Sequence, residues 1–265
     1  MSRRHQSRHP HTTRSEVEHY HPQWWYIWIP LFGAFIWFGT ILSMLITWLA
    51  QGGTGRPRYP SQDSSVPYIS DVGADLLKPL FVTGCCITAV ALVVSLSLER
   101  YLRHSGRLIP AMRRREKVFS TLAVLSAFIG GLGIILLSIF DTKRFPTLHD
   151  IFLLVFMVGV VLSALFTCVE YRWISHDFRF IRELRRAYIA KGLIAFILVV
   201  LAIAFAATFT SSTSTGAILE WTIALGFTFY MLTFYYDFRM ARGVHRNELT
   251  PSAVENQRRW VNMKQ

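Results

Sequence analysis

Long hydrophobic blocks alternate with polar stretches along most of the chain. Six of these blocks each contain roughly the 20 residues that an α-helix needs to cross ~30 Å of hydrocarbon. They predict transmembrane helices at 27–49, 79–98, 118–140, 151–169, 192–210 and 217–238. Two connections, 141–150 and 211–216, are short, which makes the helices that they join antiparallel neighbours. The pattern therefore predicts an all-α, polytopic membrane protein with a six-helix transmembrane bundle.

Polar stretches at both ends and after the first span lie outside the predicted bundle. We expect a disordered cytosolic tail over 1–26, an outer loop over 50–78 and a cytosolic tail over 239–265. The first stretch holds five of the nine histidines, but without regular metal-ligand spacing, which favours a solvated tail. It also carries four arginines and no small-residue cleavage site. We therefore expect the first span to be a signal-anchor rather than a removable signal peptide.

Positive charge is concentrated on one side of the predicted bundle. Of the 28 Lys and Arg residues, 23 fall in the two tails and in the connections 99–117 and 170–191. The positive-inside rule then places both termini in the cytosol. Topology thus accounts for most of the net charge of +12. Because no nucleic-acid recognition module accompanies this charge, we do not expect binding to nucleic acid.

Arginines on the cytosolic side are candidates for contact with the inner leaflet. Between 174 and 188, apolar residues recur at helical spacing while the arginines fall largely on another face, which indicates an amphipathic helix. Each basic residue near an anionic membrane surface is worth about 1 kcal/mol. A purely topogenic role for these charges is the alternative. The candidate contacts are Arg113, Arg114, Arg115, Arg179, Arg182, Arg185 and Arg186.

Ionisable residues at the outer ends of the predicted spans form a second candidate site. Glu220 lies one turn inside the last span, where a charge is costly unless it is paired or hydrated. Residues from the outer loop and from the connection 141–150 lie at the same end of the bundle. The expected outer cluster is Ser70, Asp71, Asp75, Asp141, His149, Asp150 and Glu220.

In a structural or recognition role for this cluster, Asp71 and Asp75 cap turns or a short helix. Glu220 then pairs with Lys78 or His149, and the pocket holds a lipid headgroup. Buried charges are usually satisfied in this way without taking part in chemistry. This interpretation is the one that the residues favour.

A catalytic role would need a base and a nucleophile at one place. His149 would be the base, oriented by Asp141 or Asp150, with Ser70 or one of Ser211, Ser212 and Ser214 as nucleophile. No nucleophile motif accompanies these residues. His149 is the single histidine on the outer side, which disfavours a zinc site, and we predict neither a metal nor a cofactor. The candidate catalytic residues are His149, Asp141, Asp71 and Glu220.

Three motifs in chain order mark the outer ends of the spans. The first is PYISD at 67–71 with Gly73 and LKPLF at 77–81, and the second is Phe140-Asp141 followed by His149. The third lies in the last span and contains Glu220, Trp221, Ala224, Gly226, Phe227, Tyr230, Leu232, Thr233, Phe234, Asp237 and Phe238. Together they resemble the FRAG/DRAM/SFK family of membrane proteins, the CWH-type N-terminal domain, from the first span to the end of the sixth.

The resemblance implies six spans with cytosolic termini, in agreement with the charge distribution. The roles of the family diverge. Fungal suppressor-of-four-kinase proteins support phosphatidylinositol 4-kinase signalling and lipid organisation at the plasma membrane. Damage-regulated autophagy modulators act at lysosomes, and another branch acts in lipid exchange on GPI anchors in the Golgi. The outer-loop motif is most similar to the fungal branch, whereas the last span is equally similar to the autophagy modulators.

We therefore predict a non-enzymatic, multi-pass membrane protein that modulates phospholipid organisation or recruits a lipid kinase complex through its basic cytosolic segments. Its expected partners are membrane lipids, including anionic phospholipids on the cytosolic side. The plasma membrane is the expected location, with the lysosome or vacuole and the Golgi or ER as alternatives. The alternative functions are a GPI-anchor type lipid-remodelling enzyme or subunit, and a DRAM-like autophagy modulator. A transporter fits less well, because most spans lack polar residues at mid-depth.

Overall fold

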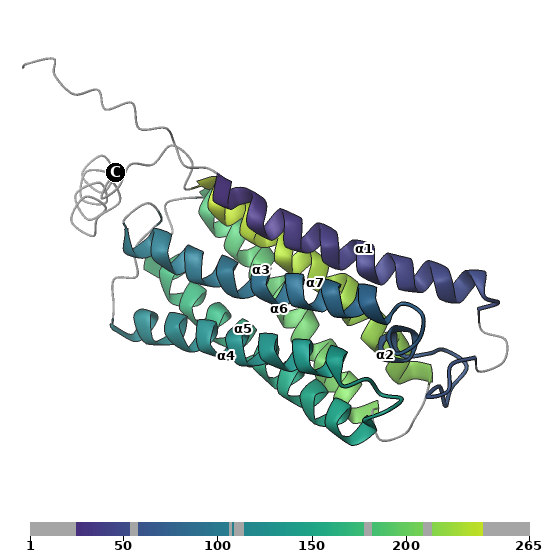
Figure 1. Ribbon diagram of the computed structural model, residues 1–265. Coiled ribbons are helices and arrows are strands. Elements are labelled where there is room, and N and C mark those ends of the chain that lie inside the picture. Colours follow the sequence, from purple (N-terminus) through teal and green to yellow (C-terminus); the bar gives the residue numbers. More distant parts are fainter. Residues whose placement is uncertain are drawn as a thin grey trace, which may run out of the picture.

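The computed structural model describes residues 25–53, 58–105, 108, 114–177, 182–208 and 214–240. These residues form long, roughly aligned helices with one short helix at one end of the bundle (Figure 1). The elements are the 3₁₀ turn η1 (Trp25–Ile27) and the α-helices α1 (Trp28–Ala50), α2 (Ile69–Gly73), α3 (Lys78–His104), α4 (Arg114–Ile139), α5 (Pro146–Asp177), α6 (Arg182–Thr208) and α7 (Ser214–Met240).

Six of the described helices, all except α2, are long and apolar enough to cross a membrane. The predicted all-α, six-span architecture is confirmed, and the chain is an integral membrane protein. Several helices run past their hydrophobic blocks: α3 continues to His104 and α5 extends from Pro146 to Asp177. Polar residues such as Glu and Arg are good helix formers, so a helix does not end where hydrophobicity ends. Most of the predicted tails, 1–26 and 239–265, lies outside the described residues.

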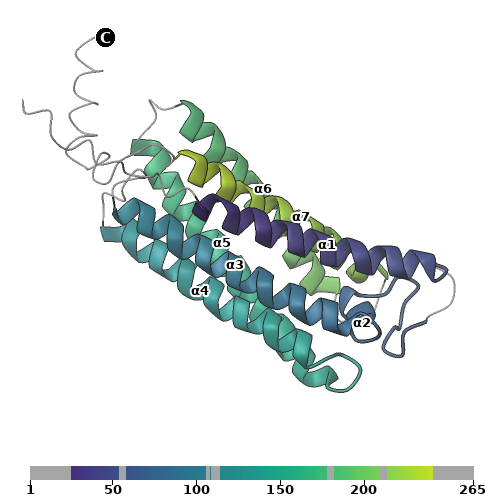
Figure 2. The same cartoon turned by 45° about the horizontal axis from the view of Figure 1, so that its top comes forward.

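The six spans form a ring. Each packs against two neighbours in the order α1, α3, α4, α5, α6, α7 and back to α1 (Figures 1 and 2). Because the number of spans is even, α1 begins and α7 ends at the same end, which we call the tail end. The opposite end carries α2 and is called the cap end below. The charge distribution predicts that the tail end faces the cytosol.

Contacts between neighbouring spans differ in closeness. Helices α4 and α5 approach through Gly130, Gly133 and Gly159: a Cβ added to Gly159 would lie 2.5 Å from the backbone nitrogen of Gly130. Small residues permit such backbone contact where lipid removes the hydrophobic drive for association. Gly130 therefore serves to pack α4 against α5. In contrast, α5 and α6 make the sparsest contact of any neighbouring pair in the ring.

Side chains on the outside of the ring are large and apolar, such as Phe35, Leu154 and Ile203. Inside, the indole N–H of Trp37 on α1 donates a hydrogen bond to the backbone oxygen of Ala224 on α7, at 2.8 Å and fully within the bundle. An apolar exterior around a packed interior with satisfied polar groups is what a bilayer solvent requires.

Candidate functional site: a polar cap, a buried ion-pair network and the cavity between them

Asp71 organises the loop that closes the cap end. Its carboxylate accepts the backbone N–H of Tyr68 at 2.9 Å and the hydroxyl of Ser61 at 2.6 Å. The first bond satisfies a free donor at the start of α2, as an N-terminal carboxylate does in many helices. Burial raises the pKa of Asp71, and these two hydrogen bonds oppose that rise. The predicted capping role is confirmed for Asp71, whereas Asp75 is exposed and Ser70 is half-buried.

Helix α7 holds this loop through side-chain bonds to its backbone. Glu220 Oε2 accepts the N–H of Ile69 at 2.7 Å, and the indole N–H of Trp221 donates to the backbone oxygen of Pro67 at 2.9 Å. The predicted pairing of Glu220 with Lys78 or His149 is therefore wrong. A helix N-terminus presents unpaired N–H groups and a positive dipole end, so α2 itself supplies the partner for the carboxylate.

Lys78 pairs instead with Asp141. The two side chains form a salt bridge between the start of α3 and the connection after α4, and Asp141 Oδ1 also accepts the backbone N–H of Arg144 at 2.7 Å. Burial would raise the pKa of Asp141, but the hydrogen bond and charge of Lys78, together with Arg144, lower it overall. This pair joins α3 to the connection between α4 and α5 at the cap end.

His149 is buried at the start of α5 and faces the end of α4. Its Nδ1 lies 2.9 Å from the backbone oxygen of Leu137 and 3.0 Å from that of Phe140, so Nδ1 carries a hydrogen and donates it. Its Nε2 is buried and has no hydrogen-bond partner among the described residues. Asp141 is occupied by Lys78, and Asp150 is exposed on α5. The arrangement of base and orienting carboxylate required for nucleophilic catalysis is not assembled in the described part of the chain.

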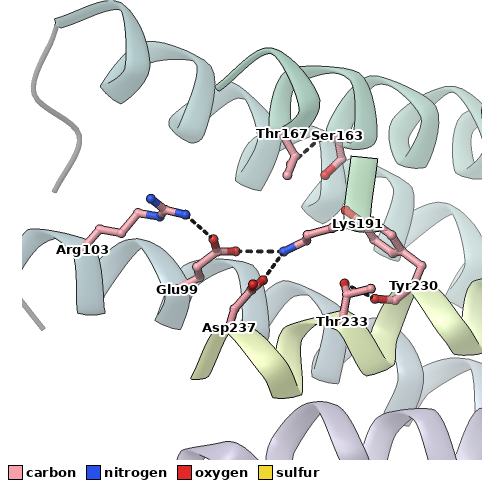
Figure 3. A network of polar contacts seen from close by, with 8 residues as sticks. All are labelled: Glu99, Arg103, Ser163, Thr167, Lys191, Tyr230, Thr233 and Asp237. Atoms are coloured by element: carbon pink, nitrogen blue, oxygen red, sulfur yellow. Dashed lines mark hydrogen bonds and ion pairs between the residues drawn. The ribbon is translucent and has the colours of Figure 1, made fainter. Parts of the chain in front are cut away.

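At the tail end, Lys191 of α6 lies within a network of buried charges. Its ammonium is 2.6 Å from Asp237 Oδ2 on α7 and 3.4 Å from Glu99 Oε2 on α3 (Figure 3). Glu99 Oε1 accepts from Arg103 at 2.8 Å, and the Lys191 ammonium also lies 3.7 Å from the ring centroid of Phe234. The four charged side chains are all at most 6% exposed. Two carboxylates and two cationic side chains meet in these contacts.

This network corrects one expectation from the sequence. Lys191 and Arg103 count among the basic residues of the predicted cytosolic connections, yet both are buried inside the bundle. Lys191 pairs there with Asp237 of the last span. The sequence contains a signal for this network, because Glu99, Lys191 and Asp237 each lie within one residue of a predicted span end on the same side. Opposite charges at equal depth on different spans can meet, because an unpaired charge there is costly.

An apolar cavity lies between the cap and the network. It has a volume of about 90 Å³ and is lined by all six spans together with Ile69 of α2. Glu220 lies in its wall toward the cap end, and Tyr230, which borders the ion-pair network, lies toward the tail end (Figure 3). At ~24 cal/mol per Å³, leaving about 90 Å³ empty costs roughly 2 kcal/mol.

Comparison with known proteins identifies the chain. Residues 25–241 match the Frag1/DRAM/Sfk1/Cwh43P N-terminal domain, which covers most of the sequence. The chain belongs to the Frag1/DRAM/Sfk1 family. The predicted resemblance to this family is thereby confirmed.

Two fungal members of the Frag1/DRAM/Sfk1 family are similar to this chain. Protein SFK1 of Saccharomyces cerevisiae is 27% identical over 176 residues, which is 56% of this chain and 49% of that protein. Protein sfk1 of Schizosaccharomyces pombe is 25% identical over 228 residues, 85% of this chain and 68% of that protein. The match thus spans about half the length of the budding-yeast protein. No solved structure matches the chain.

The motifs that carry the family resemblance meet in the cap. Glu220 and Trp221 bond to the backbone of Ile69 and Pro67, Lys78 pairs with Asp141, and Asp71 accepts the N–H of Tyr68 within the loop. These contacts fix the loop onto α7 and join α3 to the connection after α4. In this chain the motifs therefore close the cap.

The described residues contain no group of three or more His, Cys, Asp or Glu side chains that could hold a metal ion. The prediction of no metal and no cofactor stays a prediction. Of the basic candidates, Arg114 and Arg115 are exposed in the first turn of α4 at the tail end. Arg113 and Arg179 lie outside the described residues, and the side chains of Arg182, Arg185 and Arg186 lie outside the described part of α6.

Proposed function

We propose that this protein is non-enzymatic and alters how phospholipids are distributed in its membrane. The observation that carries the proposal is the apolar cavity lined by the six spans. Within a bilayer, the available apolar ligands are lipid tails. A protein that binds one state of a lipid more tightly than another shifts the lipid population toward the bound state by mass action. The family resemblance, which implies lipid organisation for the fungal branch, supports the same role.

The bonding in the cap supports a non-enzymatic role. Asp71, Asp141 and Glu220 each accept hydrogen bonds that fix the loop or its neighbours. A general base must reach the proton of a substrate. His149 is 3% exposed and uses Nδ1 on the backbone, so its placement suits packing better than proton transfer.

A second role is supported by the basic edge of the tail end. Arg114, Arg115 and Lys117 are exposed around the first turn of α4. Basic residues at this depth attract anionic inner-leaflet lipids by about 1 kcal/mol each. We propose that this edge contacts anionic phospholipids and assists recruitment of a lipid kinase complex, at the plasma membrane.

Removing the protein from its host cell tests both roles. Two readouts are needed: the outer-leaflet fraction of NBD-labelled phospholipids, measured by dithionite quenching, and the amounts of phosphoinositides. We expect at least a twofold change in the first, reversed by the wild-type chain. The triple variant Arg114→Glu/Arg115→Glu/Lys117→Glu should restore the first readout and fail to restore phosphoinositide levels. Unchanged values of both readouts in the absence of the protein would contradict the proposed function.

A further inference from the structure

We propose that the groove between α5 and α6 is a lateral port through which one acyl chain of a zwitterionic phospholipid reaches the interior cavity. In this arrangement the headgroup lies beside Asp150 at the cap end. The inference rests on the proposed function and names the class of lipid and the place where it binds.

The groove and the cavity share a wall. The groove has a volume of about 540 Å³ and is lined by the first half of α5, beginning at Asp150, and by the last part of α6. Five side chains line both spaces, namely Leu153, Met157, Val161, Ala202 and Phe205. Only one layer of apolar side chains therefore separates the lipid-facing surface from the interior.

Helix α6 is held in a way that leaves this seam free to widen. At the tail end, Lys191 ties α6 to α3 and α7 through two ion pairs. Toward the cap end, Ala202 and Ala206 of α6 line the groove, and α6 stays in contact with Tyr68 of the cap through Phe205. Because the contact of α6 with α5 is the sparsest in the ring, and apolar contacts in lipid provide little net attraction, this seam can widen more readily than the others.

The position of the groove selects the occupant. Leu154 and Ile203 are each 64% exposed and lie within spans, so the groove faces the hydrocarbon region where acyl chains are the surrounding medium. A flexible chain can turn from the groove into a cavity of about 90 Å³, whereas the fused rings of a sterol cannot bend. The geometry therefore favours a single acyl chain.

The charges around the two spaces select the headgroup. Among the described residues that line them, Asp150 and Glu220 are the charged ones, and both are acidic. Asp150 is exposed at the end of the groove where a headgroup would lie. An acidic side chain there attracts the amine of a zwitterionic headgroup and repels an anionic one.

Photo-crosslinking of the purified full chain tests this site. The chain is reconstituted in nanodiscs that contain phosphatidylcholine with a diazirine near the end of one acyl chain, and adducts are mapped by peptide mass spectrometry. We expect adducts at α7 residues inside the ring, such as Ala224 and Phe227, which surrounding lipid does not reach because each is 7% exposed. Unlabelled phosphatidylcholine should compete at least fivefold better than phosphatidylserine.

Variants of α6 provide the control. Ala202→Phe places a ring in the shared wall and should lower the interior adducts at least fivefold. Val200→Phe adds a ring on the same helix at a lipid-exposed position that lines neither space, and should leave the adducts unchanged. If Ala202→Phe does not fold, Ala206→Phe blocks the groove from its exposed side.

Three results would overturn the inference: no interior adducts in the wild type, equal labelling of the blocked and control variants, or stronger competition by phosphatidylserine. Preferential interior labelling by a diazirine sterol would also count against it. Because this experiment uses purified protein and reads binding alone, it can fail while the lipid phenotype of cells without the protein remains.

Discussion

Helix α5 has one tight neighbour and one loose neighbour. On one side, the glycines of α4 and α5 bring the two backbones together, so that even a methyl group at Gly159 would collide with the backbone of Gly130. On the other side, α5 and α6 are separated by a groove of about 540 Å³. Both seams lie among apolar side chains in the same bilayer. The difference shows that residue size, rather than hydrophobicity, decides where this bundle is closed.

The largest expected effect concerns how α6 is retained despite its loose seam. Lys191→Met removes the cation that lies between the buried carboxylates of Asp237 and Glu99. Breaking a buried ion pair by removing one partner costs about 3–5 kcal/mol. We expect a loss of this size in the free energy of unfolding, measured by denaturant titration in detergent micelles.

The double variant Lys191→Met/Asp237→Leu is the matched control, because it removes one cation together with one carboxylate and leaves Glu99 paired with Arg103. Replacing a whole buried pair with apolar residues is often neutral or stabilising. It should therefore recover most of the lost stability. A double variant as unstable as the single one would show that Lys191 stabilises α6 through packing alone.

An intermediate effect is expected at the tight seam. Gly159→Ala adds a methyl group against backbone atoms that cannot easily move, and such overpacking costs about 1–3 kcal/mol. Gly192→Ala is the control, because an added Cβ on this α6 glycine meets nothing within 4 Å. There the gain in helix propensity should stabilise the protein by about 0.5–1 kcal/mol. The stability of both variants is measured by thermal unfolding, with tryptophan fluorescence as the signal. Equal changes in melting temperature would contradict the close packing of α4 against α5.

The smallest effect is expected at the cap, through the dependence of stability on pH. The pKa of Asp141 is lower in the folded protein, so its contribution is present above the ordinary value near 4 and is lost as the pH falls below it. Relative to Asp141→Asn, the wild type should be more stable at pH 7 by up to about 1 kcal/mol, because Lys78 is partly exposed.

This stability difference should close as the pH falls from about 4 through the lower pKa of Asp141 in the folded protein. Asp71, whose raised pKa acts in the opposite direction, is present in both proteins and cancels in the comparison. Asp75→Asn, at an exposed carboxylate of the same loop, is the matched control substitution. A stability difference between wild type and Asp141→Asn that stayed constant with pH would mean that the Lys78 pair does not stabilise the fold.

Hydropathy was sufficient to predict the six spans, because an uninterrupted apolar block has few other stable locations. The residues of the cap were also predictable, since Asp71, Asp141 and Glu220 stand out as charges beside apolar blocks. Their partners were not, because Glu220 bonds to a backbone N–H that exists as a free donor only once α2 has formed. The cavity and groove depend on side-chain volumes across several helices, which a linear sequence does not reveal.

The Lys191 network also constrains how the protein is assembled during synthesis. A lysine or aspartate costs about 2.5–3.5 kcal/mol to insert at the centre of a span and less near a span end, where Lys191 and Asp237 lie. Glu99 of α3 precedes Lys191 in the chain, and Asp237 of α7 follows it, so α6 enters a membrane that already holds its first counter-charge. The strongest contact, with Asp237 at 2.6 Å, forms only when α7 arrives. Helices α6 and α7 are thus expected to leave the insertion machinery as one hairpin. In a chain truncated before α7, α6 is expected to be inserted in the membrane less stably.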